Sequence, residues 1–134
     1  MELAGLQSLQ SLYLTDCQVT DVGLKGLAGL KSLQVLNLGN TKVTGAGLNE
    51  LVGLKSLQVL YLYDTAATDM GLKDLAELKN LQFLNLANCP GVTDARLTDL
   101  GAMKSLKYLR LYLTKVTPAG AAALRKDLPA CAIP

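Results

Sequence analysis

The sequence offers few side chains that could carry out catalysis. Its 134 residues include no histidine, which removes the commonest general base and the commonest transition-metal ligand. Asp16 and Asp64 occupy equivalent positions two repeat units apart, and two strand spacings put them roughly 10 Å from each other. That separation is too long for a retaining glycosidase and near the limit for an inverting one. We therefore expect no enzyme, no cofactor and no metal site.

The cysteines are predicted to be structural. Cys17 and Cys89 occupy a repeat position that is otherwise held by threonine (Thr41, Thr65 and Thr114), which predicts a small buried group that hydrogen-bonds to nearby backbone. Three strand steps, roughly 14 Å, separate the two thiols, whereas a disulfide needs Cα atoms within about 7 Å. Cys131 falls in a core leucine position. Three unpaired thiols, together with the lack of a signal sequence in this chain, favour the cytoplasm.

These side chains are carried by a repeat that occupies almost the whole chain. The hexapeptide LQVLNL at 33–38 returns with small changes at residues 9–14, 57–62, 81–86 and 106–111. The step is 24 residues three times and then 25. A fixed period of this size is typical of a solenoid, in which each unit buries its apolar face against its neighbours.

One unit is predicted to contain a strand, a turn and a helix. Leu36 and Leu38 alternate with polar or small residues, as in a short strand with one buried face. Leu48, Leu51 and Leu54 recur every third residue, which indicates a helix or a tight helical turn. Because every crossover runs the same way, the strands are expected to be parallel, with the helices on the outer side of a right-handed α/β solenoid.

Threonine–aspartate pairs are predicted to cap the helices. They occur at residues 20–21, 68–69 and 93–94, and their side chains can accept hydrogen bonds from the first helical turn. In the last unit Thr117 precedes Pro118, a residue that suits the first helical position. Gly45 replaces the aspartate in the second unit, so we expect the weakest helix start there.

The full unit resembles the leucine-rich repeat. Its pattern is Leu-x-x-Leu-x-Leu-x-x-Thr/Cys-x-Val-Thr-Asp-x-Gly-Leu-x-x-Leu-x-x-Leu, and it covers about residues 9 to 133. The Thr/Cys position resembles the cysteine-containing subclass, known from ubiquitin-ligase subunits and bacterial repeat proteins. The chain has no F-box-like region, so the bacterial type is favoured. The resemblance implies a horseshoe segment that recognises other molecules, usually proteins, without catalytic residues of its own.

The fourth unit departs from the pattern at two places. It has an extra residue near Pro90, and Arg96 stands where the other units have Gly23, Gly47, Gly71 and Gly120. A local loop rearrangement that turns Arg96 toward solvent is one interpretation. A functional bulge on the rim is the other.

The chain is predicted to be a single domain over residues 1–134 with about five repeats. A partial repeat occupies residues 1–8, and a C-terminal cap with a truncated sixth strand occupies about 118–134. Since Leu3–Leu6 matches only the back half of a unit, we expect either a fragment of a longer array or another chain covering the first strand. Repeat arrays need such end units to cover the last core layer.

Charge and hydropathy exclude two kinds of partner. The 13 basic and 11 acidic residues are interleaved, with a net charge of +2, whereas a nucleic-acid binder would gather its basic residues on one face. No apolar run reaches the roughly 18 residues that a membrane span requires. The expected partner is therefore a protein or peptide.

The outward-facing strand positions should form the binding surface, because every aromatic residue falls on them. The predicted partner-binding residues are Tyr13, Tyr61, Tyr63, Phe83, Asn85, Tyr108, Arg110, Tyr112 and, at the rim, Asp64. Tyr and Arg dominate interface hot spots, and Tyr108 and Tyr112 are expected to flank Arg110 in a cation–π arrangement. The neighbouring column of Asp16, Asn40, Asp64 and Asn88 is explained mainly by turn chemistry.

Two alternatives remain open. Tyr and Phe have high strand propensity and could occupy these positions for that reason alone. The chain could also be a structural or scaffold subunit that docks through its uncapped N-terminal repeat. The leading hypothesis is a non-catalytic recognition module that binds a protein or peptide through the concave sheet, on a rigid surface that lowers the entropy cost of binding.

Overall fold

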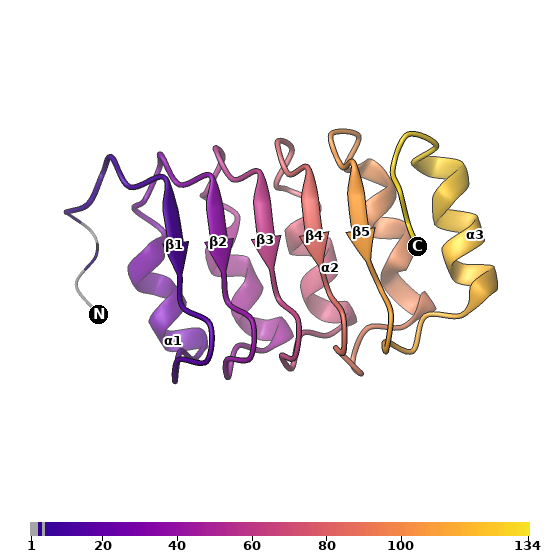
Figure 1. The fold of residues 1–134 in the computed structure, drawn as a ribbon, viewed down its shortest axis with the longest axis horizontal. Coiled ribbons are helices and arrows are strands. Elements are labelled where there is room, and N and C mark those ends of the chain that lie inside the picture. The colour runs from indigo at the N-terminus through magenta and orange to yellow at the C-terminus, as the bar shows by residue number, and fades with distance from the viewer. Residues whose placement is uncertain (1–2, 4) are drawn as a thin grey trace.

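Five short parallel strands form a single sheet in chain order (Figure 1). The computed structural model describes residue 3 and residues 5–134. The expected partial repeat at 1–8 therefore includes three residues that lie outside this description. The strands are β1 (Ser11–Tyr13), β2 (Val35–Asn37), β3 (Val59–Tyr61), β4 (Phe83–Asn85) and β5 (Tyr108–Arg110).

The helices all lie on one side of this sheet, as the repeat pattern predicts (Figure 1). Several are 3₁₀ helices, in keeping with leucines spaced three residues apart. They are α1 (Asp21–Leu24), η1 (Lys25–Leu27), η2 (Gly45–Leu51), α2 (Asp69–Leu75), η3 (Asp94–Ala102) and α3 (Pro118–Asp127). The predicted α/β solenoid is confirmed, and the sheet face opposite the helices remains open.

The strand register follows the repeat period. Leu12, Leu36, Leu60, Leu84 and Leu109 are successive partners across the sheet. The 25-residue step does not disturb this register, because Phe83 still pairs with Tyr108. The extra residue is accommodated in the turn at Pro90–Gly91, where Gly91 bridges to Thr68.

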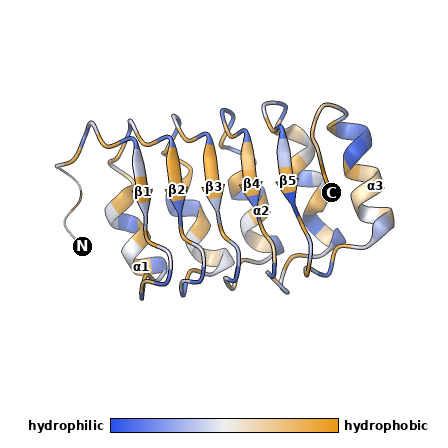
Figure 2. Ribbon diagram, in the orientation of Figure 1, coloured by the Kyte–Doolittle hydropathy of each residue, from blue (hydrophilic) through white to orange (hydrophobic). Residues whose placement is uncertain are grey.

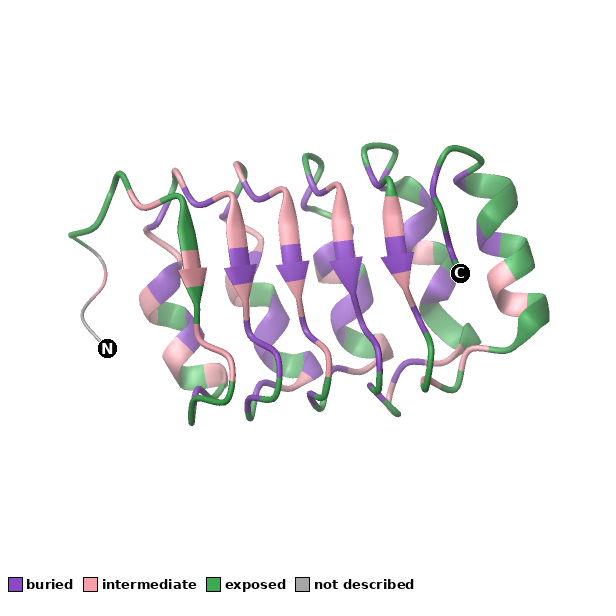
Figure 3. Cartoon of the chain, in the orientation of Figure 1, coloured by how far each residue is buried: buried purple, intermediate pink, exposed green. Residues whose placement is uncertain are grey.

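The core is a continuous stack of leucines between the sheet and the helices. Leu36, Leu60 and Leu84 have no exposed surface, and the cluster of buried residues in the described chain contains no aromatic side chain. The central residues of β2 to β5 are buried, as Figure 3 shows in purple. Figure 2 shows the same contrast in hydropathy, with β2 and β3 strongly hydrophobic and β1 and β5 paler.

The helix predicted to begin after Thr117 is confirmed in the last unit. Thr117 caps α3 by accepting a hydrogen bond from the Gly120 N–H at 3.1 Å, and Pro118 begins the helix. The predicted sixth strand is reduced to one parallel bridge between Tyr108 and Ala132. Cys131 and its neighbour Ile133 are buried against the last core layer.

One cysteine prediction is wrong. Cys89 is buried, and its Sγ donates to the Leu62 carbonyl of the preceding repeat at 3.1 Å; burial raises the pKa of this thiol. Burial also raises the pKa of the Cys131 thiol. Cys17, which was expected to be buried in the same way, is exposed. It belongs to the first full repeat, where the described chain provides no preceding strand to cover it.

The first repeat is less well covered than the others. The pattern across β1 is exposed, half-buried, exposed, whereas β2 and β3 have a buried central leucine. Leu12 and Leu14 pack against the core but remain partly accessible. Figure 3 shows this end of the sheet mostly in green and pink. In the described part of the chain, no helix is long and apolar enough to cross a bilayer.

Candidate binding surface

The open side of the sheet, here called the strand face, contains three columns of five residue positions. Strand pairing fixes the first two columns, and the third continues through backbone bonds such as Asp16 N–H to the Gly39 carbonyl at 3.1 Å. This alignment is the one expected from the repeat period for outward-facing strand positions. They are Ser11, Val35, Val59, Phe83, Tyr108; Tyr13, Asn37, Tyr61, Asn85, Arg110; and Thr15, Gly39, Tyr63, Ala87, Tyr112.

An aromatic row crosses β3, β4 and β5. The Tyr61 and Phe83 ring centroids are 5.1 Å apart at 48°, and Phe83 stacks on Tyr108 at 5.6 Å with only 8° between the planes. Tyr63 meets Tyr61 edge-on, at 6.4 Å and 88°. Contacts of this geometry hold aromatic rings in fixed orientations. We call Tyr61, Tyr63, Phe83 and Tyr108 the aromatic row.

Arg110 contacts the ring of Tyr108, as predicted, but its second ring is Phe83 in place of Tyr112. Its guanidinium carbon is 5.5 Å from the centroid of Tyr108 and 5.8 Å from that of Phe83. This second ring comes from β4, where Phe83 pairs with Tyr108, because neighbouring strands of a parallel sheet are only about 4.8 Å apart. Tyr112 instead lies 58% exposed at the end of its column.

The remaining tyrosines occupy distinct environments. The ring of Tyr63 lies over Gly39, where an added Cβ would come within 2.3 Å of it. This close approach explains a glycine in an otherwise side-chain-bearing column. Tyr13 is 64% exposed on β1, two strands away from Tyr61 and outside the aromatic row.

Asn85 does not belong to the accessible surface and is withdrawn from the candidate site. Only 4% of it is exposed, and its Oδ1 accepts the Ala87 N–H at 3.0 Å. Asn37 makes the same bond to Gly39 at 2.9 Å. The side-chain amide of each asparagine therefore accepts a hydrogen bond from the backbone just after the strand.

Asp64 lies at the rim with a structural role of its own. It accepts a hydrogen bond from Asn88, and Asp16 accepts one from Asn40 at 2.6 Å. All members of this column have a left-handed backbone, with φ of 61°, 51°, 55° and 53° for Asp16, Asn40, Asp64 and Asn88. Asn and Asp tolerate this region best, which confirms the predicted turn chemistry. Leu113 adopts φ 57° in the same column and is exposed.

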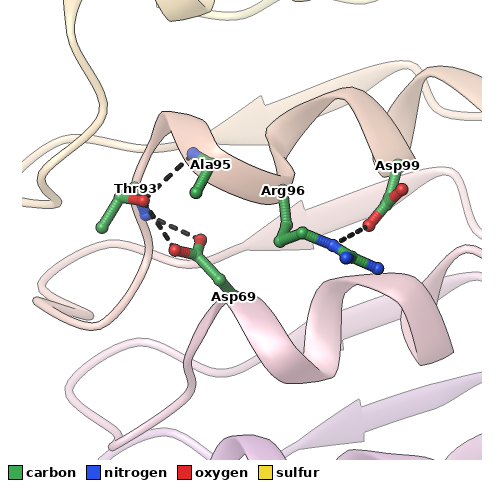
Figure 4. Close-up of polar contacts among 5 residues, drawn as sticks. All are labelled: Asp69, Thr93, Ala95, Arg96 and Asp99. Carbon is green, nitrogen blue, oxygen red and sulfur yellow. Dashed lines mark hydrogen bonds and ion pairs between the residues drawn. The ribbon is translucent and has the colours of Figure 1, made fainter.

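The helix starts hold a set of residues whose role the sequence reading missed. Asp69 accepts both the N–H and the O–H of Thr93, at 2.9 and 2.6 Å (Figure 4). Asp21 binds Thr44 at 2.8 and 2.6 Å, and Asp94 binds Thr117 at 2.9 and 2.5 Å. The hydrogen bonds from Thr117 lower the pKa of the Asp94 carboxyl. The aspartates therefore join consecutive repeats.

Capping occurs only at the threonines that an aspartate holds. Thr44, Thr93 and Thr117 each accept an N–H from the first turn of their helix, whereas Thr20 and Thr68 do not. A hydroxyl that donates to the preceding carboxylate has its lone pairs free for the helix. The predicted caps at residues 20–21 and 68–69 are therefore wrong, and the helix after Thr44 has a side-chain cap despite Gly45.

Arg96 points toward solvent, which agrees with the first interpretation, a local loop rearrangement. Its Nε bonds Asp99 within η3 at 2.8 Å, and about half of its side chain is exposed. Figure 4 shows Arg96 extending toward Asp99 while Asp69 still binds Thr93. In this unit, which has the extra residue, a residue with a Cβ is therefore compatible with the joint between repeats, as we call the aspartate–threonine link.

A polar recess borders the start of β3 and β4. It has a volume of about 380 Å³ and is lined by Gln34, Ser56, Gln58, Asn80, Gln82 and Ser105. The recurrence of glutamine directly before the strands was a signal for this feature. Among the described residues, no group of three potential ligands could hold a metal ion.

Stacked units with this leucine pattern define a class, the leucine-rich repeat solenoid. The family model described as "leucine rich repeat" matches residues 7–66, and the whole described chain has the fold of a leucine-rich repeat solenoid. No match was found among curated proteins.

Two similar solved structures are bacterial. Internalin C2 of Listeria monocytogenes is 30% identical with a TM-score of 0.70, over 98% of this chain and 54% of the internalin chain. A leucine-rich repeat protein of Leptospira interrogans is 26% identical with a TM-score of 0.65, over 98% of this chain and 38% of its own. The chain thus spans about half or less of the length of these relatives. The bacterial-type resemblance is confirmed.

Proposed function

We propose that the protein is a non-catalytic recognition module that binds a protein or peptide through the strand face. The observation that carries this proposal is the aromatic row, in which three successive contacts link four rings on a partly exposed sheet surface. Leucine-rich repeat proteins generally mediate protein–protein interactions, which supports the general class.

The rigidity of the sheet supports the choice of this face. Each strand is hydrogen-bonded to its neighbours and lies on fully buried leucines, so the rings are held in place before a partner arrives. Preorganisation lowers the entropy cost of binding, and aromatic side chains contribute a large contact area with few rotatable bonds. Strand propensity alone does not account for rings being gathered on three adjacent strands.

Affinity capture with crosslinking and mass spectrometry from native bacterial lysate tests the proposal. Tyr61→Ala, Tyr108→Ala and Arg110→Ala should each weaken capture while leaving the fold intact. Met70→Ala is the matched control, because Met70 is 74% exposed on the helix side. Unchanged capture by all three strand-face variants would reject this binding surface.

A second candidate is a structural role in which another chain docks on the first repeat. Leu12 is only partly buried, whereas its counterparts Leu36 and Leu60 are fully covered. Sedimentation measurements separate the two functions: a mass that rises with protein concentration, and that Tyr61→Ala and Tyr108→Ala do not change, would favour docking through β1.

A further inference from the structure

We propose that the segment recognised by the strand face is a peptide that carries one carboxylate, received by Arg110, next to apolar or aromatic side chains that pack on the aromatic row. This inference rests on the proposed peptide-binding function and specifies the chemistry of the partner. It follows from three features of the described residues: the distribution of charge, the state of Arg110, and the position of Asp64.

The strand face is almost free of charge. Among the fifteen positions of its three columns, Arg110 is the one charged residue. A partner with several charges would have to leave most of them without a complement, which is costly in a desolvated interface. The face therefore fits a mainly uncharged segment with one negative group.

Arg110 is held in place without an anionic partner. Two rings fix its guanidinium at 5.5 and 5.8 Å, and the described residues give it neither a hydrogen bond nor an ion pair. A guanidinium has five N–H donors in a planar fork that matches a carboxylate. Its donors are consequently available, and its orientation is already set by Phe83 and Tyr108.

The surroundings of Arg110 predict the orientation of the bound peptide on the strand face. Val59 and the aromatic row offer apolar surface toward β3, while Arg110 lies on β5. Asp64 exposes its carboxylate at the rim after β3, so a second acid in the ligand would be repelled there. We expect the acid of the ligand to lie toward β5 and its apolar side chains to lie toward β3.

A nucleic acid fits this surface less well. Tight binding to a phosphate backbone depends on several cationic contacts, and the strand face offers a single one. The same carboxylate chemistry can come from an Asp or Glu side chain or from a free peptide C-terminus, and the experiment below distinguishes these sources.

The probe is a phage-displayed library of random heptapeptides, selected against the immobilised full chain. Wild type should enrich peptides with an acidic residue beside aromatic or aliphatic residues. Arg110→Gln should lose the acidic preference and keep the apolar one, and Arg110→Glu should enrich Lys or Arg at that position. Lys107→Gln is the matched control, since this exposed lysine precedes β5 and should leave the selection unchanged.

Synthetic versions of the enriched peptides then give affinities. Arg110→Gln should weaken an acidic peptide about ten- to hundredfold, as expected for loss of a charge-assisted hydrogen bond. Replacing the acid of the peptide by its amide should have the same effect on wild type and none on the variant. Amidated and free C-termini are compared in parallel, so that loss on amidation assigns the carboxylate to the terminus.

The outcomes separate this inference from the proposed function. Peptides that need Tyr61 and Phe83 but show no preference for an acid would overturn the role of Arg110 and leave peptide recognition standing. If no enriched peptide depends on Tyr61, Phe83 or Tyr108, both the inference and the strand-face function are wrong. Equal melting temperatures of the variants and wild type verify that the changes act on binding.

Discussion

The helix starts and the strand face repeat with the same period, yet their side chains serve different ends. At the helix starts, Asp21, Asp69 and Asp94 reach across to the next repeat and hold its threonine. On the strand face, side chains in equivalent positions range from Ser11 to Tyr108 without changing the register. We infer that the first region fixes the stacking, and that the second is free to vary with the partner.

The largest effect on stability is expected from Gly47→Ala. An added Cβ would lie 2.2 Å from Oδ1 and 2.8 Å from Cβ of Asp21, so this side chain must shift, in a unit that lacks the extra residue present where Arg96 is tolerated. Overpacking and lost hydrogen bonds together should lower the free energy of unfolding by about 2–4 kcal/mol, measured by urea denaturation. Gly23→Ala is the matched control, since its nearest contact would be Val19 at 3.4 Å.

Asp69→Ala should have the next largest effect. It removes both hydrogen bonds to Thr93 and with them the orientation of the cap on Ala95. We expect a loss of about 1–3 kcal/mol by the same measurement. The control is Glu77→Ala, an exposed acid just after α2; an equal loss in both variants would mean that the joint between repeats is not what Asp69 stabilises.

Gly45→Asp is expected to supply the aspartate that would bind Thr68 of the next repeat. Gly45 stands where the aspartate of other units binds the next threonine, and Thr68 lacks a cap interaction. The Thr68 hydroxyl must rotate, because it now lies 2.0 Å from where the new Cβ would be. We expect a gain of up to about 1 kcal/mol, seen as a higher melting temperature and abolished by Thr68→Val.

Tyr61→Ala tests whether the strand face, unlike the helix starts, contributes little to stability. Tyr61 is half-buried and contacts Tyr63 and Phe83 at the surface, so its removal should cost no more than about 1 kcal/mol of stability. Thermal melting checks this value. A loss as large as that from Gly47→Ala would show that the strand face is needed for folding and is not free to vary.

The pH dependence of stability should reveal the smallest effect, at Asp94. Its pKa is lowered in the folded protein, so the carboxylate stabilises the fold above its unfolded pKa of about 3.9. This contribution is lost as the pH falls through the folded value. Asp94→Asn should flatten the acid limb of a plot of stability against pH, whereas Asp99→Asn, an acid paired only within its own helix, serves as the comparison.

The fold could be predicted because a single feature, leucine at a recurring position of the repeat, determines it. A leucine at residue 36 must be buried on the sheet, and its recurrence at Leu60 and Leu84 fixes the register of neighbouring strands. The helix side and the cap at Pro118 follow from similarly local rules. The columns of the strand face were therefore accessible from the sequence.

The details that failed all depend on a neighbouring repeat. Whether Thr68 caps its helix is decided by Gly45, 23 positions earlier, and Arg110 finds its rings partly on β4. Asn85 is buried at the position where it pairs with Tyr61 and Arg110 of the neighbouring strands. A pattern within one unit contains no information on these contacts, since they form only when units stack.

The extra residue at Pro90–Gly91 shows that length can change in the turn without reaching the sheet, because Phe83 and Tyr108 remain paired. Pro90 is exposed, so an epitope or a fluorophore inserted beside it would project from the edge of the molecule. Such a handle would let the protein be anchored to a surface without covering the five strands.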